Sequence, residues 1–139
     1  MSLEYSVANE NLKKLILEFA EIGSAANEAQ TRFSFIDKLL EECLDWPRSE
    51  TEVERFESEG RTDYELGRPR IFIVEAKARR DGLKIPPKRA RTRVSLQSLM
   101  KFDAAVSDAI VQAQEYGAKR GVRPVAVANG PQLIAFLAT

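Results

Sequence analysis

The sequence predicts a mixed α/β domain in which helices pack against a sheet, with the element order ααβββαββ. Three observations lead to this prediction. Apolar residues recur at helical spacing in residues 11–22 and again after Asn27. Residues 71–76 form an almost continuously apolar run, which is typical of a central strand buried on both faces. The dipeptide Asn129-Gly130 separates two short apolar stretches, which indicates a turn between two late strands.

Two helices are expected in the first third of the chain. Residues 11–22 form the first, because one stripe of this segment is apolar (Leu12, Leu15, Ile16 and Phe19). Asn27 is suited to the N-cap of the second helix, with Gln30 as its capping-box partner. This second helix is expected to run to about Leu44 and to bury Phe33, Ile36, Leu40 and Cys43.

Three strands and a loop are expected next. Residues 52–56 alternate weakly, as an edge strand does, residues 61–66 form a second strand, and residues 71–76 form the strongest one. A turn at residues 67–69 would fold these strands into an antiparallel meander. Residues 81–93 contain Gly82, Pro86 and Pro87, and are expected to be a loop.

A long helix and two strands complete the predicted order. The helix is expected over residues 96–120, with a candidate break near Asp103, and Gly121 is suited to its C-terminal end. Residues 122–128 and 132–137 are the last two strands, although Pro131 departs from a strict two-residue hairpin loop.

The chain has the size and composition of one globular domain. It has 139 residues, of which 44% are hydrophobic and 30% are charged. Residues 1–139 are therefore expected to form a single domain, either a whole protein or a piece of a longer one. The longest apolar run is far too short to span a bilayer, and nothing near the start reads as a signal peptide. We therefore expect a cytoplasmic location and no membrane partner.

The chain has no histidine and one cysteine, which excludes several classes of chemistry. Nucleophiles of the Ser-His-Asp and Cys-His types need a histidine. Ordinary zinc sites need more nitrogen and sulfur ligands than this chain has, and a disulfide within the chain is excluded as well. Cys43 lies on an apolar helical stripe, so we expect a buried thiol. Carboxylates, lysine and a metal bound through oxygen remain for catalysis.

The charges balance overall but not locally. The chain has 21 Lys and Arg and 21 Asp and Glu, so its net charge is zero. Residues 77–93 are strongly basic, with Asp81 as the single acid, whereas acids dominate residues 41–59. The basic part of the loop, residues 84–93, is expected either to contact phosphates or to be solvated charge, and the sequence favours neither.

Asp63, Glu75 and Lys77 form the candidate site. With a turn near Arg68, Asp63 would lie opposite Val74 or Glu75, and Glu75 and Lys77 project from one face of their strand. A carboxylate buried at a strand end needs a compensating cation, and Mg²⁺ is commonly held by one or two carboxylates and several waters. Lys77 could then orient a water or stabilise charge on a phosphate. The alternative is an ordinary surface ion pair between Glu75 and Lys77.

Several stretches occur in an order and spacing that resemble a known family. Asp63 is followed, after an apolar strand, by Glu75-Ala76-Lys77. The other stretches are Asn27-Glu28-Ala29-Gln30-Thr31-Arg32 leading into Ile36-Asp37-Lys38-Leu39-Leu40, Gly60-Arg61-Thr62-Asp63-Tyr64, Gln112-Ala113-Gln114-Glu115-Tyr116, and Asn129-Gly130. Together they resemble the PD-(D/E)XK nuclease superfamily, and more closely the N-terminal nuclease domain of type I restriction enzyme R subunits, over about residues 27–137.

The resemblance implies a restriction-endonuclease-like fold, a mixed β-sheet flanked by helices, and a metal-dependent site. Asp63 and Glu75 would ligate Mg²⁺ or Mn²⁺, helped by the carbonyl of Ala76. Lys77 would position the attacking water.

The resemblance also implies roles for residues outside the strands. Glu28 would reach the site from its helix, directly or through a water, with an i,i+4 pair to Arg32 as the alternative. Gln112 and Tyr116 would face the DNA backbone or brace the site, with ordinary helix-surface polarity as the alternative. The residues of the basic loop that would contact phosphates are Lys84, Lys88, Arg89, Arg91 and Arg93.

The expected function is therefore that of a magnesium-dependent endodeoxyribonuclease domain of restriction-enzyme type. In type I enzymes this domain is joined to a motor, and this chain carries no Gly-x-x-x-x-Gly-Lys motif of its own. A homodimer would suit double-strand cleavage. The alternative is a non-catalytic module on the same fold that binds nucleic acid or protein.

Overall fold

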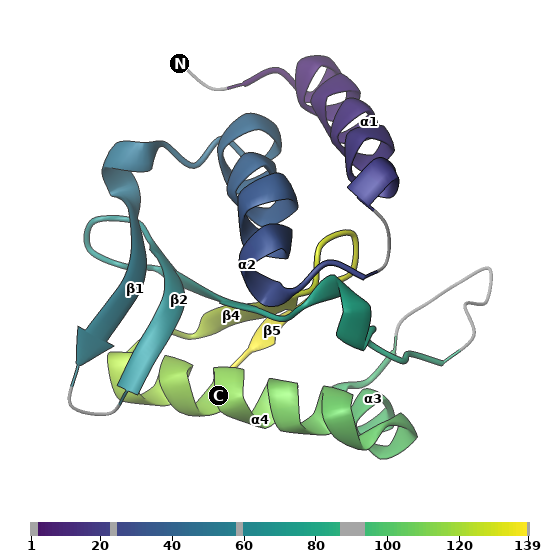
Figure 1. Ribbon diagram of the computed structural model, residues 1–139. Coiled ribbons are helices and arrows are strands. Elements are labelled where there is room, and N and C mark those ends of the chain that lie inside the picture. The colour runs from purple at the N-terminus through teal and green to yellow at the C-terminus, as the bar shows by residue number, and fades with distance from the viewer. Residues whose placement is uncertain (1–2, 23–24, 58–59, 87–93, 139) are drawn as a thin grey trace.

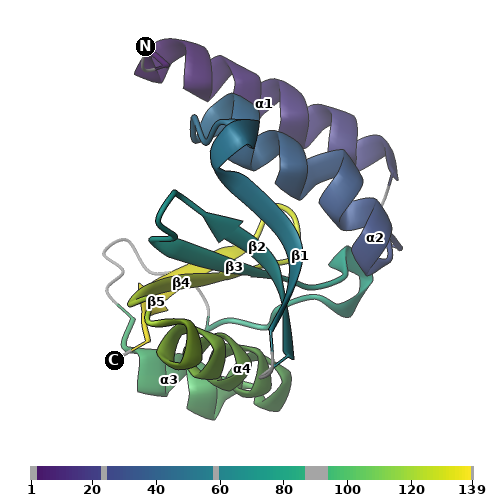
Figure 2. The ribbon, with the colours of Figure 1, turned by 90° about the vertical axis from the view of Figure 1, so that its left-hand side faces the viewer.

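The sheet and its two helical layers define the structure, a computed structural model that describes residues 3–22, 25–57, 60–86 and 94–138. Five strands form one mixed sheet in the order β1-β2-β3-β4-β5. Figures 1 and 2 show that α1 and α2 cover one face of this sheet and that α3 and α4 cover the other. The predicted α/β class is confirmed. Within those residue ranges, no helix is long and apolar enough to span a membrane.

The first helix, α1 (Tyr5–Ile22), begins earlier than the apolar periodicity predicted. It buries Leu15 and Phe19, two members of the predicted stripe, against the rest of the helical layer. Ile16, a third member, is 45% exposed, because α1 packs on one side only and lies at the outside of the molecule (Figure 2).

The second helix is capped as predicted at its start. α2 (Glu28–Thr31) begins after Asn27, whose side-chain oxygen accepts the backbone N–H of Gln30 at 2.8 Å. The reciprocal half of a capping box is not formed, because the Gln30 side chain donates to Ser34 instead. The helix continues as two π-helical stretches, η1 (Arg32–Ile36) and η2 (Leu39–Cys43).

The π-helical stretches change which side chains face the core. A π-turn closes i→i+5 hydrogen bonds, so the residues that follow are rotated relative to an α-helical pattern. Ile36, Leu40 and Cys43 are buried as predicted. Phe33, however, is 73% exposed, and Phe35 is buried in its place. The prediction for Phe33 was wrong because it assumed an unbroken α-helical period.

The predicted meander is present. Its strands are β1 (Thr51–Glu57), β2 (Gly60–Leu66) and β3 (Phe72–Ala76), and both neighbouring pairs are antiparallel. Short 3₁₀ turns precede and follow it, η3 (Arg48–Glu50) and η4 (Arg79–Asp81). The three strands follow one another along the chain and are joined by short connections. Their pairing with neighbours is therefore expected from the sequence order.

The predicted long helix is two helices, α3 (Leu96–Phe102) and α4 (Ala104–Arg120). Asp103 between them has an extended backbone (φ −149°, ψ 132°), and its side chain accepts the N–H of Val106 at 3.1 Å. It is therefore the N-cap of a new helix. The observed order is ααβββααββ, and the predicted break near Asp103 accounts for the difference.

The two helices form a crossover between parallel strands. β3 pairs in parallel with β4 (Pro124–Ala128), and β4 pairs antiparallel with β5 (Leu133–Leu137) at the edge of the sheet. A parallel pair needs a long connection, which here passes over one face of the sheet as α3 and α4 (Figure 1).

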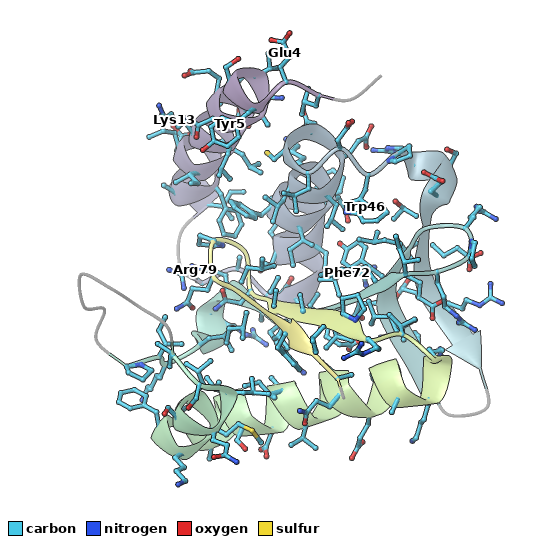
Figure 3. The ribbon with its side chains drawn as sticks, turned by 180° about the vertical axis from the view of Figure 1, so that it is seen from behind. Glu4, Tyr5, Lys13, Trp46, Phe72 and Arg79 are labelled. Carbon is cyan, nitrogen blue, oxygen red and sulfur yellow. The ribbon has the colours of Figure 1, made fainter. Side chains whose placement is uncertain are left out.

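Side chains that alternate along the central strands supply two separate cores. Val74 and Ala76 belong to the core under α1 and α2, and Trp46 and Phe72 pack at its margin (Figure 3). Ile73 belongs to the other core, under α4, with Val106, Ile110, Ala113, Val125 and Val127. Because successive residues of a strand face opposite ways, Glu75 shares the α4 face with Ile73.

Candidate active site

The two candidate metal-binding carboxylates lie on neighbouring strands. Tyr64 pairs with Val74 in the β2–β3 ladder, which sets Asp63 opposite Glu75. Oδ2 of Asp63 accepts the backbone N–H of Ala76 at 2.8 Å, and the backbone N–H of Asp63 lies 3.4 Å from Oε1 of Glu75. The residues are only 5% and 3% exposed. Each carboxylate is therefore held by the backbone of the opposite strand.

Glu75 is short of compensating positive charge. Burial and, after it, the negative charge of Asp63 raise the pKa of Glu75, hydrogen bonding from the Asp63 backbone and the charge of Lys77 lower it, and the net result is a pKa of about 8. Two close, buried carboxyl groups, one of which resists ionisation, are a donor set that suits a hard divalent cation, because the cation can take the place of the proton.

The donor set is small. The described parts of the chain contain no group of three or more histidine, cysteine, aspartate or glutamate side chains placed to hold a metal. Asp63 and Glu75 would supply two carboxylates, a number that fits Mg²⁺ because this ion commonly keeps several waters. Ala76, whose carbonyl is the third predicted ligand, is buried in the β3–β4 ladder opposite Ala128.

Lys77 follows β3 and is tethered to α4. Its Nζ donates to Oε1 of Gln112 at 2.7 Å, and its backbone N–H donates to the carbonyl of Ala128 at 2.8 Å. A pocket of about 300 Å³ opens beside it, lined by Lys77, Gly82, Leu83, Ala105, Asp108, Ala109 and Gln112. Lys77 therefore borders this pocket, whereas neither carboxylate lines it. Because Glu75 is only 3% exposed, Glu75 and Lys77 do not form an ordinary ion pair at the surface.

Gln112 and Tyr116 both turn towards the sheet but contact different parts of it. Gln112 holds Lys77, as described above. Tyr116 lies against Gly60 at the start of β2, where a Cβ atom would meet the Tyr116 hydroxyl at 3.0 Å. The guanidinium of Arg120 lies 5.8 Å from the Tyr116 ring centroid. Gln112 thus belongs to the site, whereas Tyr116 braces the strand that carries Asp63.

Glu28 contacts neither carboxylate. It is exposed in the first turn of α2, and among the described residues its side chain forms no ion pair, either with Arg32 or with any residue of the site. A direct contact of Glu28 with the site and a pair with Arg32 are therefore both missing among the described residues, while the contact through a water stays a prediction. Arg32 instead lies near Glu54 and Asp63. Helical spacing in the sequence cannot predict contacts between residues so far apart along the chain.

Arg32 is the site residue that the sequence did not single out. Its Nη1 lies 4.0 Å from Oδ1 of Asp63 and 3.5 Å from Oε1 of Glu54. Its guanidinium is 5.0 Å from the ring centroid of Tyr64. Within the sequence, Arg32 reads only as one basic residue on a helix.

The segment after Lys77 is hydrogen-bonded to the start of the α2 layer. The backbone N–H of Arg79 donates to Oγ1 of Thr31 at 3.0 Å, and that of Arg80 donates to the carbonyl of Ala26 at 3.1 Å. Figure 3 shows Arg79 at this end of the helical layer. The start of the α2 helix, and with it Arg32, is therefore fixed next to the end of β3.

The basic loop is described only in part. Lys84 is exposed. Lys88, Arg89, Arg91 and Arg93 lie outside the described residues.

A second polar cluster on the α4 face is structural. Glu65 of β2 accepts three hydrogen bonds, from Arg120 Nε at 3.1 Å, from Arg70 Nη1 at 2.8 Å and from the Thr62 hydroxyl at 2.7 Å. These partners hold the pKa of Glu65 below its ordinary value despite burial. Arg120 also donates to the carbonyl of Gly60 at 2.7 Å. This fully partnered carboxylate contrasts with Glu75.

No protein-family model matches this chain, and comparisons with curated proteins and with solved structures found no match. The functional interpretation therefore rests on the residues of the site.

Proposed function

We propose that this chain is an endodeoxyribonuclease domain of the PD-(D/E)XK type, dependent on Mg²⁺ or Mn²⁺, which hydrolyses phosphodiester bonds of DNA. The observation that carries the proposal is the buried Asp63–Glu75 pair, in which the pKa of Glu75 is raised to about 8. Burial of two close carboxylates is costly, and it is expected where a cation binds.

Each residue of the proposed site has its own role. Asp63 and Glu75, with the Ala76 carbonyl, would hold the divalent ion. When bound, that ion would activate a water and stabilise negative charge on the phosphate. Lys77 would orient the attacking water and stabilise charge on the phosphate, and Gln112 holds the Lys77 ammonium at 2.7 Å.

The order of the elements supports this proposal. A short meander carries Asp63 and Glu75 on paired strands, and the crossover to β4 carries Gln112 back over the same sheet face. Asp63, the Glu75-Ala76-Lys77 strand and Gln112 are parts of the sequence that resemble the nuclease domain of type I restriction R subunits. DNA is the substrate proposed from that resemblance, in a cytoplasmic restriction enzyme whose motor would lie elsewhere in a longer chain, with a homodimer proposed for double-strand cleavage.

The proposal is tested by incubating the purified chain with supercoiled plasmid. Nicking is expected with Mg²⁺ or Mn²⁺ and not with EDTA, and it should be lost in Asp63→Asn, Glu75→Gln and Lys77→Gln. Glu41→Gln is the control, because Glu41 is exposed and pairs only with Arg48 among the described residues. Metal-dependent DNA binding without nicking would favour the alternative, a non-catalytic nucleic-acid-binding module. Neither binding nor nicking would leave a protein-binding module as the better description.

A further inference from the structure

Arg32 lies on the opposite side of the Asp63–Glu75 pair from Lys77. We infer that Arg32 binds the phosphate group that is cleaved, so that Arg32, from the helical layer of α2, and Lys77, from the end of β3, hold this phosphate together. This inference rests on the proposed nuclease function. It adds a substrate-binding residue to that site. This residue comes from a helix that contributes neither of the carboxylates, nor Lys77, nor Gln112.

The environment of Arg32 fixes its guanidinium beside Asp63. The side chain is 16% exposed, so it is largely buried but still open to solvent. The guanidinium rests 5.0 Å from the ring centroid of Tyr64, and the Tyr64 hydroxyl donates to Asp37. The Arg32 Nε also donates to the Tyr64 hydroxyl at 3.5 Å, so the ring and the hydroxyl of Tyr64 together hold the guanidinium. Arg32 is therefore oriented before any ligand binds.

The ion pairs of Arg32 are long. Its Nη1 lies 3.5 Å from Glu54 and 4.0 Å from Asp63, whereas charge-assisted hydrogen bonds are about 2.7 to 2.9 Å long. Arg48, on the same side of the molecule, approaches Glu41 to 2.6 Å. Arg32 thus lies between two carboxylates at distances too long for a tight bidentate pair.

A phosphate suits this guanidinium better than either carboxylate does. The five N–H donors of arginine form a planar fork that matches the oxygens of a phosphate group. A phosphate placed next to Asp63 would be within reach of Arg32, while Lys77 lies at the end of β3, two residues after Glu75, and is held by Gln112 of α4. The arrangement also has a cost, since a fixed positive charge beside Asp63 opposes binding of a divalent ion at that carboxylate.

These two effects have opposite signs, which gives a specific test. Arg32→Met should bind Mg²⁺ several-fold more tightly in a calorimetric titration without DNA. The same replacement should weaken Mg²⁺-dependent binding of a labelled duplex oligonucleotide by roughly 10- to 100-fold, measured by anisotropy in a Lys77→Gln background that prevents cleavage. The log–log salt slope should fall by about 0.9, the value for one phosphate contact.

Two further variants guard against a folding defect. Arg32→Lys keeps the charge but has no planar fork, so the salt slope should stay and the affinity for DNA should fall less than in Arg32→Met. Arg48→Met removes an exposed arginine that also pairs with a glutamate, and it should change neither Mg²⁺ nor DNA affinity.

Glu54 gives an independent measurement. Glu54 Oε1 pairs with Arg61 Nη1 at 3.1 Å as well as with Arg32 Nη1 at 3.5 Å, so the measurement is made in an Arg61→Met background. There, Glu54→Gln removes a carboxylate that competes for Arg32, and DNA affinity should rise when Arg32 is present. In the Arg32→Met/Arg61→Met background the same change should have a much smaller effect, because the two residues act through one contact. An equal effect of Glu54→Gln in both backgrounds would overturn the inference.

The remaining outcomes separate the inference from the proposed function. If the wild-type chain binds Mg²⁺ and cleaves DNA, but Arg32→Met keeps the wild-type DNA affinity and salt slope, Arg32 is only a counter-ion and the nuclease proposal stands. If the wild-type chain shows no response to Mg²⁺ and does not bind the duplex, both are overturned.

Discussion

Arg120, at the end of α4, donates from Nε to Oε2 of Glu65 in β2 at 3.1 Å, and the two side chains are 0% and 3% exposed. This buried pair joins the crossover helix to the strand that carries Asp63. Removing Arg120 takes a fully buried counter-charge from Glu65, which keeps Arg70 and Thr62 as donors, and this loss is more harmful than removing both members of the pair.

Arg120→Met is therefore expected to lower the free energy of unfolding by about 3 kcal/mol. Urea denaturation measures it. The double variant Glu65→Met/Arg120→Met should be more stable than Arg120→Met alone, because no buried charge is left unpaired. Lys119→Met, an exposed neighbour, is the control and should have little effect. A double variant that is less stable than Arg120→Met would contradict this account.

The pH dependence of stability is expected to report on Glu75. Its pKa rises from 4.5 to about 8 in the folded chain, mainly because it is buried. Between these values the folded state binds more protons than the unfolded state, so the metal-free protein should lose stability as the pH rises from 4.5 to about 8. Glu75→Gln cannot titrate and should flatten this slope. Thermal melts across that pH range, without divalent ions, make the measurement, and an equal slope in both proteins would count against it.

Asp63→Asn is expected to abolish the response to Mg²⁺. In the wild type, Mg²⁺ at about ten times its dissociation constant should stabilise the fold by roughly 1.4 kcal/mol, since it binds only the native site. For a domain of this size that corresponds to a rise in melting temperature of about 3 to 7 °C. Asp63→Asn removes the negative charge that opposes ionisation of Glu75, and the amide oxygen can still accept the Ala76 N–H, so the metal-free variant should melt no lower than wild type. A full Mg²⁺ shift in Asp63→Asn would show that the ion binds elsewhere.

Gly117→Ala is expected to destabilise the protein although alanine favours helices. A Cβ atom at Gly117 would lie 2.8 Å from Ala138, from the carbonyl of Val122 and from Val125, so α4 packs directly on the sheet there. Overpacking of this kind costs about 1 to 3 kcal/mol, against a gain of about 1 kcal/mol in helix propensity. We expect a net loss in chemical denaturation. The reverse exchange at an exposed position of the same helix, Ala118→Gly, should cost about 1 kcal/mol and serves as the propensity control.

Local pattern was enough to predict much of this protein. Residues 71–76 are apolar on both faces, which predicted a central strand, and a short turn between neighbouring strands set Asp63 opposite Glu75. Such features depend on periodicity and on short connections, both of which can be read along the chain. The spacing of Glu75 and Lys77 likewise predicted one shared face, because side chains alternate along a strand.

Only the tertiary structure decided how distant segments meet at the site. Gln112 reaches Lys77 across the crossover, and Arg32 reaches Asp63 from the opposite helical layer, through contacts that no spacing rule encodes. Phe33 turned outwards because π-helical turns shifted the phase of its helix. The raised pKa of Glu75 could not be predicted from the sequence either. It depends on how completely the two layers exclude water from the carboxylate and on how close Asp63 lies. Periodicity thus determined the elements, and packing between them determined the electrostatics of the site.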